Sequence, residues 1–432
     1  MSPPAELAVA GPRPLRGRLR LPGDKGISHR ALLFSALAEG RCHVRGIADG
    51  DDVRRTRGAL ENLGVRIGGS DRDVAVDGAG GRLLEPDLVI DCGNSGTTMR
   101  MLAGLVAAQP FQTVLTGDAS LAARPMTRVV EPLRKLGARI EGREGGELAP
   151  LSIRGGPLRG TRCELTVASG QVKTALALAG LQAGGVTEVV EPRPSRDHTE
   201  RMLAALGAPL ERVGDRAFRV ESGLLPPFEL EIPGDPSSAA FFAVAASITP
   251  GSAVVLEGLS LNPTRTGFVA VLRRMGADVE MRLTNQERLG EPVGDLVVRA
   301  APLSGTTIAP DEGSIDEVPA LAAAAAFAEG VTEICDAAEL RVKESDRIGT
   351  LTQELSQLGI AVESHRDGLT IHGGRPRAGV FKSHGDHRIA MAVAVAANAC
   401  DGDSSVRGWG AVASSYPGFA DDLAALTDGS AR

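Results

Sequence analysis

Aromatic residues are scarce in this chain of 432 residues, where they make up 3% of the sequence, with one Trp and one Tyr. The formal net charge at pH 7 is −7. Nucleic-acid binders need a basic face, and binders of single strands also need stacking rings, so the composition argues against that class. The apolar runs are too short and too interrupted to span a bilayer. The first twenty residues contain no apolar core of signal-peptide length.

Cysteine and lysine are also few. The five Cys are odd in number and scattered, and no C-x-x-C, H-E-x-x-H or other ligand spacing occurs, so neither a disulfide framework nor a metal site is predicted. A reducing cytoplasm fits this pattern best. Only five of the 47 basic residues are Lys. Three of these (Lys25, Lys173 and Lys343) lie in polar clusters, and Lys suits proton transfer because its pKa shifts readily.

What the chain does contain is a repeat. Six alanine-rich apolar runs each follow a short polar or charged cluster, and their starts are 65 to 79 residues apart. Ala and Leu favour helices, and runs that are apolar nearly all round are typical of buried helices. A long regular period indicates one folding unit that is repeated. The runs are Ser28–Gly40, Thr97–Ala108, Val172–Gly185, Ser237–Gly251, Asp316–Gly330 and Asp386–Gly402.

A second landmark follows inside most units: an amphipathic helix, a Gly that ends it, and then a strand. Short β-branched stretches at 113–117, 253–258 and 368–373 add further strands. Each unit is therefore predicted as β-α-β-α-β-β, which makes a layered α/β protein. Six units divide into two domains of three, about 200 residues each, within the usual domain range. The helix-ending glycines are Gly64, Gly137, Gly207, Gly276 and Gly359. Residues 421–429 resemble a degenerate sixth copy of this landmark.

The polar clusters stand where the buried helices begin. A helix start presents unpaired N–H groups and a partial positive charge, so several starts that point the same way favour a bound anion. N-capping is a sufficient explanation for Ser and Thr at these positions. It does not explain Lys25, Arg30, Arg100 and Arg388, because a cation at a helix start opposes the dipole. A bound anion does explain them.

Three more basic stretches remain, and two of them are open to two interpretations each. RVKESDR (341–347) is either a solvated helix face or a site where Glu344, between cations, stays ionised or exchanges a proton with a ligand. Arg124 lies in a loop that Pro125 stiffens. Arg196 lies in SRDHTE, which is either a helix capping box or part of the site.

Eight motifs follow one another along the chain: LPGDKGISHRALLFSALAEG, GNSGTTMR, LAARPM, SGQVKTAL, SRDHTERM, IDEVPALAAAAAFAEG, RVKESDR and GDHRIAM. In this order they closely resemble the 5-enolpyruvylshikimate-3-phosphate (EPSP) synthase family, from Leu21 to Pro417. The resemblance implies a two-domain inverse α/β barrel of six βαβαββ repeats, three per domain, with the active site in the interdomain cleft. The implied domains are residues 23–238, on the shikimate 3-phosphate side, and residues 1–22 plus 239–432.

The resemblance also implies a reaction. The enolpyruvyl (1-carboxyvinyl) group of phosphoenolpyruvate would pass to the 5-hydroxyl of shikimate 3-phosphate by addition–elimination, with release of phosphate, in the shikimate pathway to chorismate and the aromatic amino acids. Asp316 would accept the hydroxyl proton, and Lys25 or Glu344 would protonate the methylene carbon. The resemblance implies no metal, no organic cofactor, no nucleic-acid or membrane partner, and a cytoplasmic monomer.

Two phosphates of about −1.5 to −2 charges each near neutrality need several cations around them, and bidentate Arg side chains also fix orientation. The residues implied for shikimate 3-phosphate are Lys25, Gly26, Arg30, Ser169, Gly170, Gln171, Arg196, Asp316 and Lys343. Those implied for phosphoenolpyruvate are Lys25, Asn94, Gly96, Arg124, Gln171, Arg347 and Arg388.

Three positions depart from the family pattern. Gly26 stands where Ser is frequent, so one hydroxyl contact to shikimate 3-phosphate is missing or comes from Ser28. Gly170 stands where Ser or Ala is usual and leaves only a backbone contact. Ser414 lies where some members carry a Lys that contacts phosphate, just ahead of the C-terminal Tyr-Pro pair.

Gly96 is retained where glyphosate-insensitive relatives carry Ala, so glyphosate is expected to compete with phosphoenolpyruvate. His387 is expected to be structural. One alternative is the sister enolpyruvyl transferase that acts on a UDP-sugar, but its reactive Cys is absent from 111–124. A related repeat fold that acts on RNA 3′-phosphate ends conflicts with the acidic net charge. A catalytically inactive binding protein on the same fold is the third alternative.

Overall fold

The structure, a computed structural model, describes residues 4–309 and 315–430. The chain divides into two compact units. Unit 1 comprises Met1–Pro22, Pro233–Gln286 and Pro292–Arg432, and unit 2 comprises Gly23–Ile232 and Glu287–Glu291. The family resemblance predicts the second crossing after residue 238. Unit 1 begins instead at Pro233, so that helix α8 (Pro236–Ile248) lies wholly within it.

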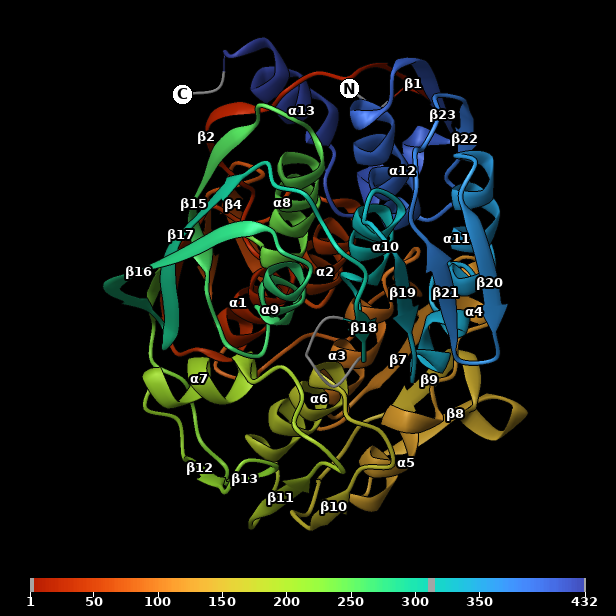
Figure 1. The fold of residues 1–432 in the computed structure, drawn as a ribbon. Coiled ribbons are helices and arrows are strands. Elements are labelled where there is room, and N and C mark those ends of the chain that lie inside the picture. Colours follow the sequence, from red (N-terminus) through yellow and green to blue (C-terminus); the bar gives the residue numbers. More distant parts are fainter. Residues whose placement is uncertain (1–3, 310–314, 431–432) are drawn as a thin grey trace. The chain divides into compact units, whose positions relative to one another are not determined.

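The core of unit 2 consists of three buried helices, α1 (Lys25–Leu37), α3 (Gly96–Val106) and α6 (Gly170–Gly180) (Figure 1). A Cβ atom on Gly104 of α3 would lie only 2.0 Å from the carbonyl oxygen of Ala175 in α6. Glycine therefore lets these two backbones approach each other directly. The outer helices are α2 (Asp51–Asn62), α5 (Thr127–Lys135) and α7 (His198–Ala205), with the short α4 (Ala119–Ala122).

Three sheets of four strands share one hydrophobic core with these helices. In each sheet the first two strands in spatial order are parallel, and the other neighbours are antiparallel. In spatial order the sheets are β14 (Glu229–Glu231), β3 (Arg41–Arg45), β5 (Val74–Asp77), β4 (Arg66–Gly69); β6 (Ile90–Asp91), β7 (Gln112–Thr116), β9 (Leu148–Arg154), β8 (Arg139–Arg143); and β10 (Arg162–Glu164), β11 (Thr187–Val190), β13 (Ala217–Val220), β12 (Leu210–Val213).

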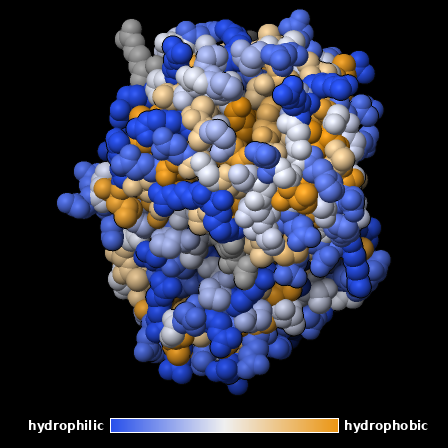
Figure 2. Space-filling view, in the orientation of Figure 1, coloured by the Kyte–Doolittle hydropathy of each residue, from blue (hydrophilic) through white to orange (hydrophobic). Residues whose placement is uncertain are grey.

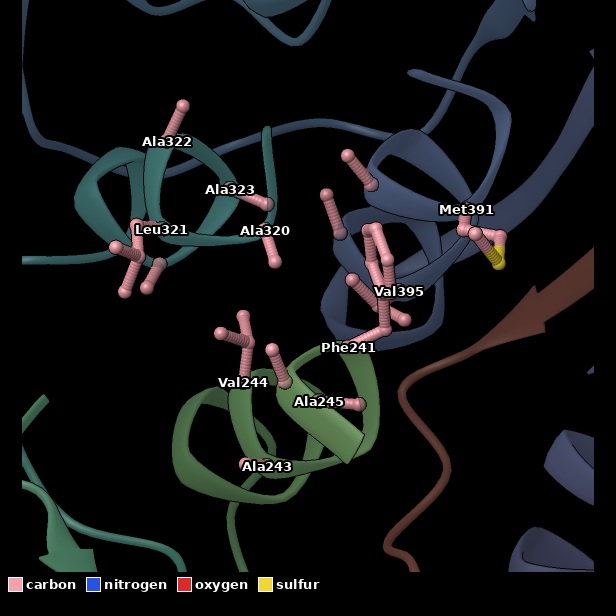
Figure 3. Close-up of a cluster of buried hydrophobic side chains, with 14 of the residues drawn as sticks. Phe241, Ala243, Val244, Ala245, Ala320, Leu321, Ala322, Ala323, Met391 and Val395 are labelled. Atoms are coloured by element: carbon pink, nitrogen blue, oxygen red, sulfur yellow. The ribbon is translucent and has the colours of Figure 1, made fainter. Parts of the chain in front are cut away.

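Unit 1 has the same kind of core, made of α8, α10 (Val318–Ala326) and α12 (His387–Ala399). Figure 3 shows these helices almost end-on, with Phe241, Val244, Ala320 and Val395 between them. The many Ala side chains keep the helices close while their apolar surface is buried on every side. The outer helices are α9 (Gly267–Arg274), α11 (Arg347–Gln357) and α13 (Phe419–Asp428), and short 3₁₀ helices lie at Ala338–Val342 and Trp409–Ser414.

Each sheet of unit 1 also contains one parallel pair of neighbouring strands. Two have four strands, and the third has three, in which the N-terminal strand β1 pairs antiparallel with β23. In spatial order they are β16 (Asp278–Arg288), β17 (Glu291–Arg299), β15 (Ala253–Ser260), β2 (Arg16–Arg20); β18 (Thr307–Ile308), β19 (Val331–Ile334), β21 (Gly368–His372), β20 (Ala361–His365); and β1 (Glu6–Gly11), β23 (Gly402–Arg407), β22 (Val380–Lys382).

One rule describes the connections. In four repeats a core helix joins two parallel neighbours: β6–α3–β7, β10–α6–β11, β18–α10–β19 and β22–α12–β23. In the other two repeats, β2–α1–β3 and β14–α8–β15, the strands before and after the core helix do not pair with each other. Instead β14 pairs with β3, and β2 pairs with β15. The chain passes from one unit to the other at these two repeats. The predicted α/β fold of six repeats is confirmed.

The predicted helix ends are also confirmed. Each of the five helix-ending glycines, and Gly429 after α13, adopts a positive φ, which glycine reaches without strain. Within the described residues, no helix is both long and apolar enough to cross a membrane. Figure 2 shows one face of the molecule, on which hydrophobic residues are dispersed among hydrophilic ones.

Candidate active site

The start of α1 places Lys25 as the first helical residue. Asp24 caps the helix by accepting a hydrogen bond from the backbone N–H of Ile27 (2.8 Å). The Nζ of Lys25 forms an ion pair with Asp52 of α2, so the ammonium group is held at the helix start where the dipole disfavours it. The buried hydroxyl of Ser28 donates to the carbonyl of Asp24 (2.8 Å) and accepts from the N–H of Ala48 (3.0 Å).

Arg30 joins three predicted binding segments of unit 2. Its Nε donates to Thr199 Oγ1 (2.9 Å), Nη1 to the carbonyl of Gly26 (2.8 Å) and Nη2 to the carbonyl of Gly170 (2.8 Å). Burial lowers the pKa of Arg30 to about 10, against the opposing effect of nearby carboxylates such as Asp24. The guanidinium group therefore remains charged at neutral pH and fixes the starts of α1, α6 and α7 around one cation.

The starts of α6 and α3 are connected by Gln171. Its side-chain Nε2 donates to Thr97 Oγ1 (2.8 Å), and its Oε1 accepts from Nη1 of Arg100 (2.8 Å). Ser169 caps α6, since its hydroxyl accepts from the N–H of Val172 (3.4 Å). The α6 start thus carries Ser169, which was predicted for shikimate 3-phosphate, and Gln171, which was predicted for both substrates.

Asn94, Gly96 and Arg124 lie together beside the start of α3. The side-chain oxygen of Asn94 accepts from Nη2 of Arg124 (2.7 Å), and its Nδ2 donates to Asp118 (2.8 Å). A Cβ on Gly96 would lie 3.5 Å from Nη1 of Arg124 and 2.9 Å from Nη1 of Arg100. Two guanidinium groups and a helix N-terminus therefore surround Gly96, an arrangement that favours an anion.

In unit 1, Arg347 is buried among carboxylates at the start of α11. Its Nε donates to Asp386 (2.8 Å) and its Nη2 to Glu344 (2.7 Å), and Nη1 lies 3.6 Å from Asp316 Oδ1. Burial by itself would lower the pKa of Arg347, but the three carboxylates raise it. Burial by itself would raise the pKa of Asp386, but Arg347 and His387 lower it. The pair is therefore ionised.

Asp316, which precedes α10, lies next to three of the other predicted residues of unit 1. Lys343 Nζ lies 3.5 Å from Asp316 Oδ1, and Nη1 of Arg388 donates to the backbone carbonyl of Asp316 (2.7 Å). Arg388 also lies 3.9 Å from the buried Glu317. Cations next to a carboxylate favour its ionised form, which is the form that accepts a proton.

The structure thus brings the predicted residues together as two groups, each within its own unit. Arg196 is half-buried, and its backbone oxygen lies 3.3 Å from a Cβ built on Gly170, so it belongs to the first group. His387, predicted to be structural, is buried with Nδ1 3.9 Å from Asp386. The group of unit 2 is Lys25, Gly26, Arg30, Asn94, Gly96, Arg124, Ser169, Gly170, Gln171 and Arg196. The group of unit 1 is Asp316, Lys343, Glu344, Arg347 and Arg388.

The structure describes the surroundings of two of the departures from the family pattern. Both hydrogen bonds of Ser28 go to the backbone, so it is not placed to replace a hydroxyl at position 26. A Cβ at Gly26 would lie 3.2 Å from Asp24 Oδ1 and 3.3 Å from Nη1 of Arg30, so glycine leaves room for the present Arg30 contacts. The hydroxyl of Ser414 donates to the carbonyl of Ala411 (2.9 Å).

Sequence reasoning missed the acidic partners of these cations. Asp52, Asp118, Asp386 and Glu317 hold the predicted residues in place, but no role was assigned to any of them. The sequence marks Arg100 as a cation at a helix start, but the family resemblance does not include it among the binding residues. Asp52 and Asp386 had a detectable signal, because an acidic residue at a helix start favours the dipole. No group of three or more His, Cys, Asp or Glu that could hold a metal ion occurs in the described ranges.

Comparison with known proteins gives a consistent result. The family model for EPSP synthase (3-phosphoshikimate 1-carboxyvinyltransferase) matches residues 9–423. The 3-phosphoshikimate 1-carboxyvinyltransferase of Thermus thermophilus is 51% identical over 423 residues, which cover 97% of this chain and 98% of the relative. That of Synechococcus sp. is 50% identical over 428 residues, which cover 97% and 96%.

Solved structures agree. EPSP synthase from Acinetobacter baumannii matches with a TM-score of 0.86 at 42% identity and covers 98% of each chain. The enolpyruvyl transferase NikO from Streptomyces tendae matches with a TM-score of 0.78 over 99% of this chain and 98% of its own, but at 20% identity this shows the fold alone. Over nearly its whole length, the chain belongs to the EPSP synthase family of 3-phosphoshikimate 1-carboxyvinyltransferases.

Proposed function

We propose that the two groups of residues described above carry out the enolpyruvyl transfer of this family. The enolpyruvyl group of phosphoenolpyruvate passes to the 5-hydroxyl of shikimate 3-phosphate, and phosphate is released. The observation that carries the assignment is the set of cations at the starts of core helices, such as Lys25, Arg30 and Arg388. A cation there is disfavoured by the dipole, and two phosphorylated substrates supply further negative charge beside that of the acidic partners.

Shikimate 3-phosphate is assigned mainly to the residues around Arg30. This guanidinium group already fixes the backbone at Gly26 and Gly170, and its charge and that of Arg196 suit a phosphate or carboxylate. The hydroxyl of Ser169 and the amide of Gln171 suit the hydroxyl groups of the substrate. Lys25, Asp316 and Lys343 complete the proposed set.

Phosphoenolpyruvate is assigned to the residues around Gly96 and Arg347. Asn94 already holds Arg124 at 2.7 Å, and the N-terminus of α3 adds N–H donors for an anion. Arg347 and Arg388 of unit 1, with Lys25 and Gln171 of unit 2, complete the proposed set. Bidentate guanidinium contacts would orient the substrate for attack at its C2 carbon.

Asp316 is assigned as the proton acceptor for the 5-hydroxyl. As the proton leaves, the hydroxyl oxygen bonds to C2 of phosphoenolpyruvate while a proton is added to C3, which gives a tetrahedral ketal. In the second step a proton leaves C3, the bond from C2 to the phosphate oxygen breaks, and the enol ether and free phosphate result. Lys343 and Arg347, 3.5 and 3.6 Å from the Asp316 carboxylate, balance its charge before the transfer.

Lys25 is the better candidate for the donor of the C3 proton. Its Nζ is a proton donor by chemistry and is held at the start of α1 by an ion pair with Asp52. Glu344 accepts a hydrogen bond from Arg347 at 2.7 Å, which favours the carboxylate that has no proton to give. We therefore assign Glu344 to orienting Arg347 and Lys25 to proton transfer.

Phosphate release tests the proposal directly. We expect release only when both substrates are present, and a loss of about 10²–10⁴-fold in Asp316→Ala, as is typical for a general base. Asp278→Ala is the matched control, because Asp278 forms an exposed ion pair with Arg299 at 3.3 Å and should leave the rate unchanged. A wild type that binds shikimate 3-phosphate without releasing phosphate would be a binding protein. Transfer to a UDP-sugar instead would reassign the acceptor.

Three further points belong to the same proposal. Glyphosate is expected to compete with phosphoenolpyruvate, because position 96 is glycine and leaves the space beside Arg124 open. The protein is expected to act as a monomer. Its expected location is the cytoplasm, in agreement with a biosynthetic role in making aromatic amino acids.

A further inference from the structure

A buried ion cluster in unit 2 has no role in the reaction described above. Lys173, in the second turn of α6, is 1% exposed, and its partners Glu191 and Glu200 are 4% and 6% exposed. The Nζ of Lys173 lies 3.0 Å from Glu191 Oε2 and 2.8 Å from Glu200 Oε1. Glu191 follows β11, and Glu200 lies in α7. The cluster therefore joins three elements that are separated along the chain.

Glu191 connects this cluster to both segments assigned to shikimate 3-phosphate. Its Oε1 accepts from the backbone N–H of Ser169 (3.2 Å) and from the hydroxyl of Ser195. Lys173 Nζ also lies 3.4 Å from the carbonyl oxygen of Ser195. Ser169 and Ser195 are neighbours of Gly170 and Arg196 in the chain, so the same carboxylate fixes the α6 start and the loop that carries Arg196.

Glu200 connects the cluster to Arg30. It follows Thr199, whose hydroxyl accepts from Nε of Arg30 (2.9 Å). Its negative charge opposes the effect of burial on the pKa of Arg30, while Arg196 acts in the opposite direction. Among the described residues, Glu200 Oε2 accepts no hydrogen bond. Two carboxylates against one ammonium leave a formal charge of −1, which favours keeping Arg30 and Arg196 close together before an anion binds.

Burying a cluster of this kind costs desolvation free energy, so a contribution to stability does not by itself account for it. Charged groups lose their hydration on burial, and apolar side chains of similar volume often stabilise a protein as well or better. The contacts to Ser169 and Ser195 give the cluster a second effect, since each one positions a segment of the proposed substrate site. Preorganised contacts of this kind reduce the ordering that binding would otherwise require.

We propose that Lys173, Glu191 and Glu200 form a positioning triad that holds the shikimate 3-phosphate segments in their binding geometry. The inference rests on the proposed function and deepens it, because it names residues that act mainly on the affinity for one of the two substrates. Asn94 and Arg124 lie together beside the start of α3, whereas the triad holds the start of α6 and the loop that carries Arg196, so affinity for phosphoenolpyruvate should depend on the triad much less.

Lys173→Met and Lys135→Met form a matched pair for the test, because Lys135 is exposed at the end of α5. Binding of shikimate 3-phosphate is measured by calorimetry, and the two KM values and kcat come from phosphate release. We expect K173M to raise the Kd for shikimate 3-phosphate at least tenfold, with less than a threefold change in the KM for phosphoenolpyruvate or in kcat at saturation. K135M should match the wild type.

Two isosteric variants keep the proposal testable if K173M fails to fold. Glu191→Gln should weaken binding of shikimate 3-phosphate more than Glu200→Gln, because the Glu191 carboxylate accepts hydrogen bonds from Ser169 and Ser195 directly. Folded variants with a Kd within twofold of the wild type, or an E200Q effect as large as that of E191Q, would overturn the triad. A wild type that neither binds shikimate 3-phosphate nor releases phosphate would instead overturn the proposed function.

Discussion

Gly96 shows how one missing side chain controls a site. A methyl group at this position would lie 2.9 Å from Nη1 of Arg100 and 3.5 Å from Nη1 of Arg124. The first distance is shorter than normal contacts allow, so the end of Arg100 must move, and the space next to Arg124 becomes smaller. The more fully a bound anion fills that space, the more the methyl group weakens its binding.

For Gly96→Ala we expect a several-fold rise in the KM for phosphoenolpyruvate and a still larger rise in the inhibition constant of glyphosate. Competition kinetics at fixed shikimate 3-phosphate measure both constants. Gly58→Ala is the control, because a Cβ there meets nothing within 4 Å, and it should add about 0.5–1 kcal/mol of helix stability without changing the kinetics. A wild type that resists millimolar glyphosate would contradict the assignment.

The surroundings of His29 disfavour its protonated, charged form. It is fully buried, and its Nδ1 lies 2.7 Å from Thr56 Oγ1. Burial, Lys25 and Arg30 lower its pKa well below 6.5, against the smaller effect of Asp24. Below pH 6.5 the unfolded chain therefore binds a proton that the folded chain does not, so stability falls as the pH falls from about 6.5 towards the folded pKa.

Urea unfolding at pH 7.0 and pH 5.5 measures this effect. The contribution of His29 should decrease by up to about 1.4 kcal/mol for each pH unit below 6.5, and His29→Gln should remove that part of the pH dependence. His43, exposed in β3, supplies the control His43→Gln, which should keep the dependence of the wild type. Equal slopes for the wild type and H29Q would show that His29 is protonated in the folded protein.

At the scale of elements, some features of the helix ends can be predicted from the sequence and others cannot. Glycines such as Gly64 and Gly359 end their helices with positive φ, and a local pattern is enough to predict this. The partner of a cation at a helix start is not local: Arg347 and Asp386 are 39 positions apart. Periodicity therefore identifies the helices and their cations, whereas the acidic partners depend on which elements pack together.

The start of α12 should be the most sensitive of these ends. Asp386 accepts from the N–H of Arg388 (2.9 Å) as the helix cap and from Arg347 at 2.8 and 3.3 Å. Asp386→Ala leaves a buried guanidinium short of its main partner, so we expect a loss of about 3–5 kcal/mol in the free energy of unfolding and a higher KM for phosphoenolpyruvate. Asp278→Ala removes an exposed ion pair and should cost less than about 1 kcal/mol. Similar losses in both variants would disprove the structural role of Asp386.

At the scale of the whole molecule, the two units differ in how the chain builds them. Unit 2 takes all strands of its three sheets from the continuous segment Gly23–Ile232, since β14 at the end of that segment pairs with β3 near its start. Unit 1 takes β1 and β2 from the N-terminus and the rest from Pro233 onward. The repeat in the sequence predicts six units, but each repeat alone would pair its own strands. The exchange of strands at the crossings becomes visible only in the sheet pairing.

This asymmetry predicts different behaviour for two fragments of the chain. Residues 23–232 should fold alone, because they retain three core helices and every strand that pairs with them. They lose Glu291, which lies 2.7 Å from the buried His198, so we expect lower stability than in the full chain. The fragment should bind shikimate 3-phosphate weakly through Arg30 and Ser169, and release no phosphate, since Asp316 is missing.

Residues 233–432 should not fold alone, because β15 and β23 each lose a neighbour, β2 and β1. Unpaired strand edges leave backbone groups without partners and promote aggregation. Circular dichroism and urea titration of both fragments measure the difference, and joining residues 4–22 to 233–432 through a flexible linker is the matched control that should restore cooperative unfolding. A cooperative transition for 233–432 without those strands would show that β1 and β2 are dispensable. In that case the exchange of strands would not determine how this chain is divided.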